Sequence, residues 1–501
     1  MNIEQLVSKY KEYRTQMQAL GYANYLISWD SETIAPIGCF EIRSAQVGIL
    51  SEMAYKIERS EEYINIVNSL NDNIDSLDEI LKVEIKKVHK ELMNTLKIPM
   101  KELVDYSILI SKAQNIWAEA KNSNDYSKFK NTLAEIIVFN KKLSKYLEDS
   151  SLKGYDTLLD QYEEGMTKEK YDEFFKLLKE EIVPLVSKIN QVKQDAPLWS
   201  KRLFNIQKQK EFSAYLMNVM CFDQTKGLMA ESEHPFTSGF GTTDVRVTNH
   251  YYEDNLISSI FSAIHELGHA TYEQGCNPIL DNTLVGGGST MAMHESQSRF
   301  YENIVGRSYE FWVAHYPKLK EIFSEELIDV SLEEFYKFVN YVECSLIRTE
   351  ADELTYPLHI MVRYEIEKMI IEQDVNVDEL PAIWNKLYHE YLGINVPSDK
   401  QGILQDVHWA GGSFGYFPTY ALGSAYAAQL LNTMKKELNF EEEISKPNLK
   451  EINNWLKEKV HTFGGLKLPN EILLNATGES FNPKYYVEYL KNKFMKLYNI
   501  E

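Results

Sequence analysis

The sequence predicts a mostly helical protein, and three observations support that fold class. Apolar residues recur three and four positions apart through much of residues 1–200, which is the spacing of one face of an α-helix. Only one short stretch, residues 244–251, alternates in the manner of a strand. Hydrophobic residues make up 44% of the chain and charged residues 25%, a composition that can bury a large core.

The first 200 residues are expected to form one helix after another. Two amphipathic stripes carry the pattern, and their residues are Leu6, Tyr10, Tyr13, Met17 and Leu20, then Leu77, Leu81, Ile85, Val88 and Leu92. Ser76 and Glu79 have the spacing of a capping box at the start of the second stripe. Pro184 is expected to kink or divide a helix that begins near Lys168.

Residues 244–251 predict a short strand, because Val245 and Val247 alternate with Arg246 and Thr248. We expect it to form the edge of a small sheet beside the next helix. From residue 253 onward the chain is predicted to be helical again, except for two loops. One is the glycine loop at residues 285–290, and the other is the Gly- and Pro-containing segment 401–420, which is typical of a functional loop.

The stretch around which the rest is organised is the H-E-x-x-H sequence of residues 265–269. On an α-helix, residues four apart lie on one face, so His265 and His269 can bind one Zn²⁺ without bending the backbone. Glu266 follows the first histidine and can accept a proton from a water molecule that the metal activates. Apolar residues on the N-terminal side indicate that this helix is buried.

A catalytic zinc needs a third protein ligand. The metzincin pattern is excluded, because the positions that it requires hold Tyr272 and Gly275. The candidate is Glu295, which follows His269 by 26 residues. The glycine-rich residues 285–289 between them can turn the chain back, so a second helix carrying Glu295 is expected to face the first.

These motifs resemble the carboxypeptidase Taq family of metallocarboxypeptidases. The resemblance begins with H-E-L-G-H and H-E-S-Q-S-R, and further segments appear in the family's order. They are His234-Pro235-Phe236, Asp244-Val245-Arg246-Val247-Thr248, Ile347-Arg348-Thr349-Glu350-Ala351-Asp352 and Gly402-Ile403-Leu404-Gln405-Asp406-Val407-His408-Trp409. The resemblance extends from Trp29-Asp30 to Ala476-Thr477-Gly478-Glu479, and it departs from the family's pattern in the loops at 34–39 and 230–233.

The resemblance implies a mostly helical, single-domain metallopeptidase fold with a deep groove, and a homodimer. It also implies removal of single residues from peptide C-termini, without a covalent intermediate. The metal ligands would be His265, His269 and Glu295, holding one divalent metal per chain, zinc in the first instance, with cobalt or manganese as alternatives. No linker or internal repeat interrupts the sequence. We therefore expect one domain, residues 1–501, in which residues 1–200 wall or roof the groove and residues 201–501 hold the metal and substrate site.

Arg348 is the candidate anchor for a substrate's terminal carboxylate, because a planar guanidinium can bind a carboxylate through two parallel hydrogen bonds. The alternative for Arg348 is a salt bridge to Asp352, four residues later on the same expected helix.

Five further residues complete the candidate site. Tyr420, placed in the loop that ends near residue 420, is the candidate donor to the oxyanion of the reaction. The residues expected to line the cleft are His234, Arg246, Gln405 and His408.

The net charge of −21 argues against nucleic acid and anionic membranes as partners. The four cysteines, Cys39, Cys221, Cys276 and Cys344, are widely spaced, which predicts thiols in a reducing compartment. The first thirty residues lack the long apolar run of a signal peptide, and the chain has no segment of transmembrane length. We therefore expect a cytoplasmic protein.

Two alternatives to a carboxypeptidase stay open at this point. One is an endo-acting helical oligopeptidase, since helical H-E-x-x-H proteases with long channels exist. The other is a catalytically silent scaffold that binds peptides, although the intact Glu266 argues against it.

Overall fold

Helices make up most of the molecule, in agreement with the predicted fold class. The computed structural model describes residues 1–192 and 195–500. The N-terminal helices are α1 (Ile3–Thr33), α2 (Phe40–Glu58), α3 (Glu61–Asp72), α4 (Glu79–Leu96), α5 (Met100–Ser123), α6 (Lys130–Leu147), α7 (Asp156–Leu159), α8 (Lys168–Val192) and α9 (Ile206–Val219). The later helices are α10 (Leu256–Gly275), α11 (Met291–Arg299), α12 (Tyr309–Ile322), α13 (Leu332–Val339), α14 (Tyr356–Glu372), α15 (Leu380–Leu392), α16 (Pro418–Glu437), α17 (Phe440–Ile444), α18 (Lys450–Lys459), α19 (Pro469–Thr477) and α20 (Lys484–Tyr498).

The first 200 residues form helix after helix, as the apolar stripes predict. Of the two outcomes expected for Pro184, a divided helix is wrong, because Pro184 lies inside a continuous α8. The expected capping box of Ser76 and Glu79 is also wrong. The capping residue of α4 is Asp78, whose side chain accepts a hydrogen bond from Leu81 N, and Ser76 lies before it in a separate 3₁₀ turn.

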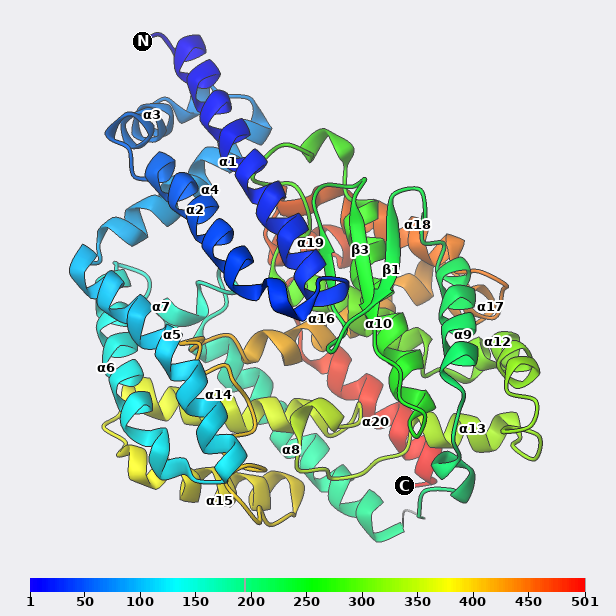
Figure 1. Ribbon diagram of the computed structural model, residues 1–501. Coiled ribbons are helices and arrows are strands. Elements are labelled where there is room, and N and C mark those ends of the chain that lie inside the picture. The colour runs from blue at the N-terminus through cyan, green and yellow to red at the C-terminus, as the bar shows by residue number, and fades with distance from the viewer. Residues whose placement is uncertain (193–194, 501) are drawn as a thin grey trace.

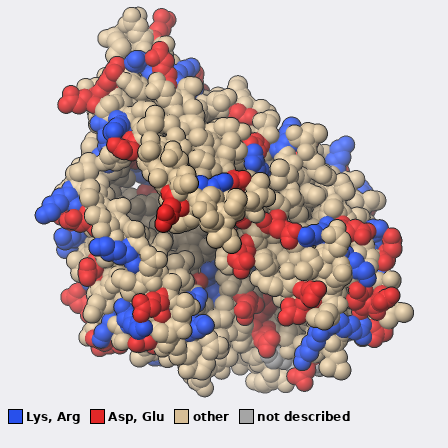
Figure 2. Space-filling model, in the orientation of Figure 1, with Lys and Arg blue, Asp and Glu red and all other residues tan. Residues whose placement is uncertain are grey.

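Two clusters of buried apolar side chains hold the helices together. The smaller cluster joins α1, α3 and α4, and the larger one extends from α5 to α20. Figure 1 shows α1 running from the N-terminus toward the strands, with α2 beside it. Figure 2 shows that this face is hollowed between the lower ends of α1 and α2 and the helices α5 and α14. Among the described residues, no helix is long and apolar enough to cross a membrane.

A small sheet packs against α10. Its strands are β1 (Gly227–Glu231), β2 (Thr237–Gly239) and β3 (Val245–Asn249), in the order β1-β3-β2. The predicted strand is β3, but the expectation of an edge position was wrong, because β1 pairs with it in parallel and β2 pairs with it antiparallel. The predicted alternation holds only in part, since Val245 and Val247 are fully buried and Arg246 is half-buried, but Thr248 is fully buried as well. Hydrogen bonds from Tyr22 and Tyr25 of α1 to Asp244 connect the N-terminal helices to this sheet.

The H-E-x-x-H sequence lies in α10, and Glu295 lies in α11, which packs against it. Asn255 caps α10 by accepting a hydrogen bond from Ser258 N. Gly268 faces α11 so closely that a Cβ there would come within 2.8 Å of the Ser298 Cα atom. A side chain at position 268 would therefore push the two helices apart.

A buried carboxyl group supports the start of α11. Glu163 is fully buried, and its Oε1 atom accepts a hydrogen bond of 3.0 Å from the Tyr426 hydroxyl. The carboxyl group lies against Thr290 and Ala292 at the N-terminus of α11, and the Tyr171 hydroxyl is also near it. Burial raises the pKa of Glu163 to about 7.

The raised pKa of Glu163 predicts that stability falls as the pH rises. Above the ordinary carboxyl pKa of 4.5 the unfolded chain has lost this proton, whereas the folded chain keeps it until about pH 7. The free energy of unfolding therefore falls through that window, by an amount on the order of 1–3 kcal/mol from this group. Glu163→Gln should remove that part of the fall, as measured by urea denaturation at about pH 5 and pH 8.

The control for this experiment is Glu321→Gln, since the Glu321 side chain is 69% exposed. That variant should show the pH dependence of the unchanged protein. If Glu163→Gln shows the same fall as well, the carboxyl group of Glu163 is already ionised in the folded chain and the prediction is wrong.

Candidate metal centre and substrate cleft

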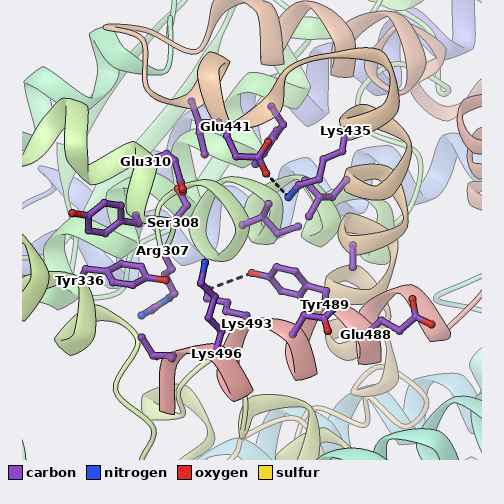
Figure 3. Close-up of a pocket in the computed structure, with 18 of the residues that line it drawn as sticks. Arg307, Ser308, Glu310, Tyr336, Lys435, Glu441, Glu488, Tyr489, Lys493 and Lys496 are labelled. Carbon is purple, nitrogen blue, oxygen red and sulfur yellow. Dashed lines mark hydrogen bonds and ion pairs between the residues drawn. The ribbon is translucent and has the colours of Figure 1, made fainter. Parts of the chain in front are cut away.

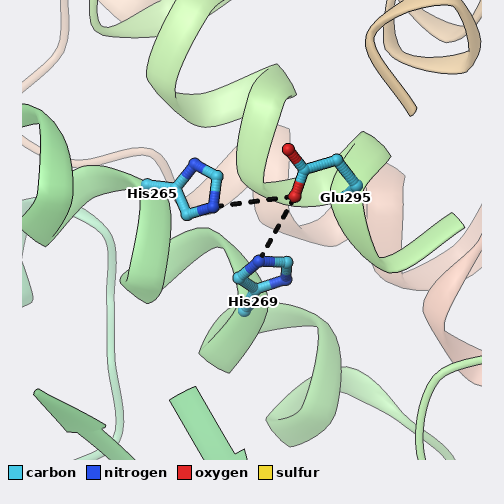
Figure 4. A group of neighbouring side chains, drawn as sticks. All are labelled: His265, His269 and Glu295. Atoms are coloured by element: carbon cyan, nitrogen blue, oxygen red, sulfur yellow. Dashed lines mark ion pairs between the residues drawn. The ribbon is translucent and has the colours of Figure 1, made fainter. Parts of the chain in front are cut away.

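Two helices bring together three side chains that could hold a metal ion. One ligand atom from each of His265, His269 and Glu295 can be chosen so that all lie within 4.8 Å of one another (Figure 4). Glu295 Oε2 lies 3.6 Å from His265 Nε2 and 3.7 Å from His269 Nε2. Bonds of about 2.0–2.2 Å to a tetrahedral ion separate neighbouring donor atoms by roughly 3.3–3.6 Å. The group therefore fits a divalent cation of this kind, and the sequence interpretation of Glu295 as the third member agrees with this geometry.

His265 is oriented by a second glutamate. Its Nδ1 atom lies 2.8 Å from Glu302 Oε2, so the Nε2 atom is the one that faces Glu295. Glu302 belongs to the π-helix η6 (Phe300–Val305), which continues directly from α11. It also accepts hydrogen bonds from Arg299 and Arg307. Burial raises the pKa of Glu302, but Arg299, His265 and Arg307 outweigh it and hold the pKa well below its usual range.

A cavity of about 710 Å³ lies near the same π-helix. Residues of α12, α13, α16, α17 and α20 line it, and charged side chains of both signs point into it (Figure 3). Lys435 and Glu441 form an ion pair of 2.6 Å in its wall. Arg307 also lines this cavity and donates to Glu302. Two side chains, Arg307 and Glu302, therefore connect the cavity to His265.

His269 is oriented by a chain of two further side chains. Its Nδ1 atom lies 2.7 Å from His294 Nδ1, and His294 Nε2 lies 2.6 Å from Glu273 Oε1. With His269 Nε2 facing Glu295, its Nδ1–H donates to His294, and His294 Nε2–H donates to Glu273. Burial lowers the pKa of His269, so the ring stays neutral, which is the form that binds metals.

Glu266 is held by the sheet. Its Oε2 atom accepts a hydrogen bond of 2.7 Å from the Thr237 hydroxyl of β2, and only 8% of the residue is exposed. Burial raises the pKa of Glu266, and the neighbouring His265 and Thr237 oppose that rise. A carboxylate of raised pKa is a better proton acceptor than an ordinary surface glutamate.

Arg348 lies in the 3₁₀ turn η7 (Arg348–Glu350), so the helix expected to join it to Asp352 is wrong, and the alternative of a salt bridge to Asp352 fails with it. The chain is extended at Ala351, and the four-residue spacing no longer places the two side chains on one face. Asp352 instead accepts backbone hydrogen bonds from Leu354 and Thr355. Arg348 donates from Nε and Nη2 to Asp406 Oδ1 at 3.1 and 2.9 Å.

Gln405 and Asp406 support Arg348. Gln405 Oε1 accepts hydrogen bonds from Arg348 N and from Arg363 Nη2, and its Nε2 atom donates to Leu346 O, Tyr388 Oη and Gln401 O. Asp406 Oδ2 accepts a hydrogen bond of 2.7 Å from Arg363 Nε. Gln405 was expected to line the cleft, but hydrogen bonds within the protein occupy both the oxygen and the nitrogen of its side-chain amide.

Tyr420 lies in the first turn of α16, so its expected place in a loop was wrong. Pro418 begins the helix, where a proline is readily accepted, and the sequence interpretation took it for a loop residue. The Tyr420 hydroxyl lies 3.3 Å from His408 Nε2, and the Arg348 Cζ atom lies 5.0 Å from the centre of the Tyr420 ring. Burial raises the pKa of Tyr420, which keeps its hydroxyl protonated, and burial lowers the pKa of His408 to about 4.

Arg246 lies in strand β3, and His234 lies in the connection between β1 and β2. Arg246 donates two hydrogen bonds to Asp244, at 2.7 and 3.0 Å, and lies over the rings of Tyr25 and Trp29 of α1. His234 is exposed. The contacts of Arg246 join the sheet to α1.

A second cavity, of about 550 Å³, lies beside His294, which contacts the candidate ligand His269. Gln18 of α1, the edge strand β2, the glycine loop around residue 287, Glu273 and His294 all line it. The sequence interpretation quoted His294 and Asp406 only as parts of longer motifs, and it missed Glu302, Glu273 and Thr237. Glu273 follows His269 by one helical turn, a spacing that could have signalled it.

Comparisons with known proteins give one consistent result. The sequence model of the carboxypeptidase Taq (M32) metallopeptidases matches residues 9–494. The chain is 43% identical to carboxypeptidase 1 of Bacillus subtilis over 476 residues, which are 94% of this chain and 95% of that protein. It is 34% identical to thermostable carboxypeptidase 1 of Pyrococcus furiosus, with 98% of each covered. The crystal structure of the M32 carboxypeptidase from Deinococcus radiodurans superposes with a TM-score of 0.94 at 30% identity, covering 99% of this chain and 100% of that chain.

Proposed function

The chain belongs to the carboxypeptidase Taq (M32) family and is a metallocarboxypeptidase, and from that premise we propose which residues perform its reaction. His265, His269 and Glu295 bind the divalent metal, with zinc as the proposed ion and cobalt or manganese as alternatives. The observation that carries this proposal is the convergence of the three ligand atoms within 4.8 Å. When bound, the metal supplies Lewis acidity that lowers the pKa of a water molecule and polarises the scissile carbonyl.

Glu266 is the proposed general base. It accepts the proton of the attacking water and later returns a proton to the leaving amine. Its hydrogen bond from Thr237 and its burial support this role, because they orient the carboxylate and raise its pKa.

Arg348 is the proposed anchor for the terminal carboxylate of the peptide. Within the described part of the chain, Asp406 and Tyr356 occupy three of the five N–H groups of this guanidinium. One N–H on each terminal nitrogen is left, and these two can hold the oxygens of one carboxylate. Asp406 and Gln405 hold the arginine in place for that contact.

Tyr420 is the proposed donor to the oxyanion, and His408 the proposed neighbour that orients its hydroxyl. We assign supporting roles to the other predicted cleft residues. Gln405 holds Arg348, and Arg246 holds α1 against the sheet, where residues 1–200 would wall the groove of a single domain. His234 is proposed to line the cleft at its exposed edge.

The two alternatives are not favoured. This chain matches proteins named as carboxypeptidases over nearly its whole length, and neither an endo-acting oligopeptidase nor a silent peptide-binding scaffold would be expected to do so. The intact Glu266 further opposes a silent scaffold.

We also propose a cytoplasmic location, and a homodimer that acts on peptides. The wide spacing of the four cysteines in the sequence supports a reducing compartment. The proposal of a dimer rests on the family resemblance and on exposed apolar side chains at the junction of α1 and α2. Ile34, Ile37 and Phe40 there are 78%, 98% and 75% exposed.

The homodimer predicts a particle of two 58.2 kDa chains in solution. Light scattering coupled to size exclusion measures this mass at micromolar concentration. A single species with the mass of one chain would contradict the proposal.

Glu266→Gln should keep the metal and lose catalysis, because the amide cannot accept the proton. Loss of a general base typically lowers kcat by about 10²–10⁴-fold. Turnover of a short peptide and metal content by atomic emission measure the two effects, and Glu321→Gln at the surface is the control. Near-normal turnover in Glu266→Gln would remove Glu266 from the mechanism.

A chelator should stop the unchanged enzyme, and Zn²⁺, Co²⁺ or Mn²⁺ should restore part of its activity.

Arg348→Ala should impair cleavage of free-acid peptides while leaving the metal content unchanged. Truncating one partner of a buried charge pair costs about 2–5 kcal/mol, which is roughly 30- to several-thousand-fold in kcat/KM. Arg348→Lys should restore only part of the loss, because lysine lacks the two-pronged guanidinium. The measurement compares one peptide as the free acid and as the C-terminal amide.

The matched control is Arg202→Ala, since Arg202 forms a surface ion pair with Asp329. C-terminal amides should be poor substrates for the unchanged enzyme, and Arg348→Ala should affect them little. If the unchanged enzyme cuts the free acid and the amide equally well at an internal bond, Arg348 is not a carboxylate anchor.

A further inference from the structure

Tyr356 lies between two arginines of different roles. Its hydroxyl accepts a hydrogen bond of 3.2 Å from Arg348 Nη1, the arm of the proposed carboxylate anchor. Its ring faces the guanidinium of Arg299, whose Cζ atom lies 4.3 Å from the ring centre. Arg299 in turn donates from Nε to Glu295 Oε1 at 2.7 Å. Three contacts therefore connect Glu295 of the metal group to Arg348.

Each member of this connection is held by a second contact. Tyr356 is the first residue of α14, is 6% exposed, and its backbone N–H donates to Asp352 O. Arg299 occupies the last turn of α11 and donates from Nη1 to Glu302 Oε2 at 3.1 Å. Arg348 is held by Asp406 on its other side. Each residue of the connection therefore has a second contact that limits its movement.

A carboxypeptidase needs such a connection for a geometric reason. The terminal carboxylate of the substrate and the scissile carbonyl belong to adjacent residue positions, so the anchor and the metal must keep one separation. A displacement of about 1 Å in a reacting group can cost roughly 10²-fold in rate. Asp406 and Gln405 hold Arg348 to the segment before α16, whereas Tyr356 relates Arg348 to Arg299 of α11.

We propose that Tyr356 is a positioning residue that sets Arg348 relative to Glu295 through Arg299. This inference rests on the proposed role of Arg348 as the carboxylate anchor. The hydroxyl of Tyr356 orients the Nη1 atom of Arg348, and the ring of Tyr356 keeps the guanidinium of Arg299 aligned with Glu295. The residue thereby selects for a peptide bond one residue from the C-terminus.

Two variants separate the two contacts of Tyr356. Tyr356→Phe removes the hydroxyl and keeps the ring over Arg299, so kcat for a free-acid peptide should fall about 10- to 100-fold with a much smaller change in KM. Its metal affinity, measured by competition with a chelator, should stay that of the unchanged protein. Tyr356→Leu removes the ring as well, and its metal affinity should also fall, by up to about 10–100-fold.

The control is Tyr316→Phe. Tyr316 is 5% exposed and its hydroxyl donates to Val330 O, so this variant also loses one buried hydrogen bond of a tyrosine. It should keep both kcat and metal affinity.

A double-variant comparison distinguishes failure of this inference from failure of the proposed anchor. Tyr356→Phe should lower the rate of free-acid cleavage when it is made in the unchanged enzyme. It should have little further effect in Arg348→Ala, because the guanidinium that Tyr356 orients is then absent. If Tyr356→Phe has no effect while Arg348→Ala does, the anchor stands and the inference is wrong. An equal loss in both backgrounds gives Tyr356 a merely structural role and also overturns it. If Arg348→Ala itself cuts free-acid peptides normally, the proposed anchor and the inference fall together.

Discussion

The close approach of α10 and α11 is the constraint on which the metal group depends. His265 and His269 come from one helix and Glu295 from the other, and their ligand atoms converge within 4.8 Å only because the two backbones nearly touch. Gly268, inside the H-E-x-x-H sequence, permits that contact against Ser298. On its other side, α11 packs equally closely on α16, where a Cβ at Gly423 would lie 2.7 Å from the Cβ of Glu295. Packing of three helices thus sets the position of one carboxylate.

Arg299 balances the charge that this packing concentrates. Glu295 lies one helical turn before it and Glu302 three residues after it, and Arg299 donates to both. These two glutamates face the two nitrogens of one ring, His265 Nε2 and Nδ1. An ordinary helix would return Glu302 to nearly the same face as Glu295, because seven residues make almost two turns. The change to a π-helix at Phe300 gives Glu302 a different direction, and helices of this rare kind often mark functional sites.

The sequence predicted the helical fold, the strand at β3 and the three clustered side chains, because each depends on a short-range pattern. Helical spacing is enough to place His265 beside His269, and the glycine-rich residues 285–289 indicate that a second helix can bring Glu295 back toward them. The errors came where long-range contacts override local spacing. Arg348 pairs with Asp406, 58 residues away, because a 3₁₀ turn and extended chain replace the expected helix. Glu302 and Tyr356 carry no pattern in the sequence that relates them to His265 or Arg348.

The electrostatics of the arginine cluster support the proposed role of Arg348 in a protein that is acidic overall. Asp406 shares its two oxygens between Arg348 and Arg363, so one negative charge lies between two positive ones and leaves a net charge of +1. Burial makes an uncompensated charge costly, and aromatic rings such as that of Tyr420 reduce this cost only in part. In the proposed function, the terminal carboxylate of a peptide would complete the pairing. The long-range repulsion expected from the net charge of −21 would then be opposed by a local, poorly screened attraction at Arg348.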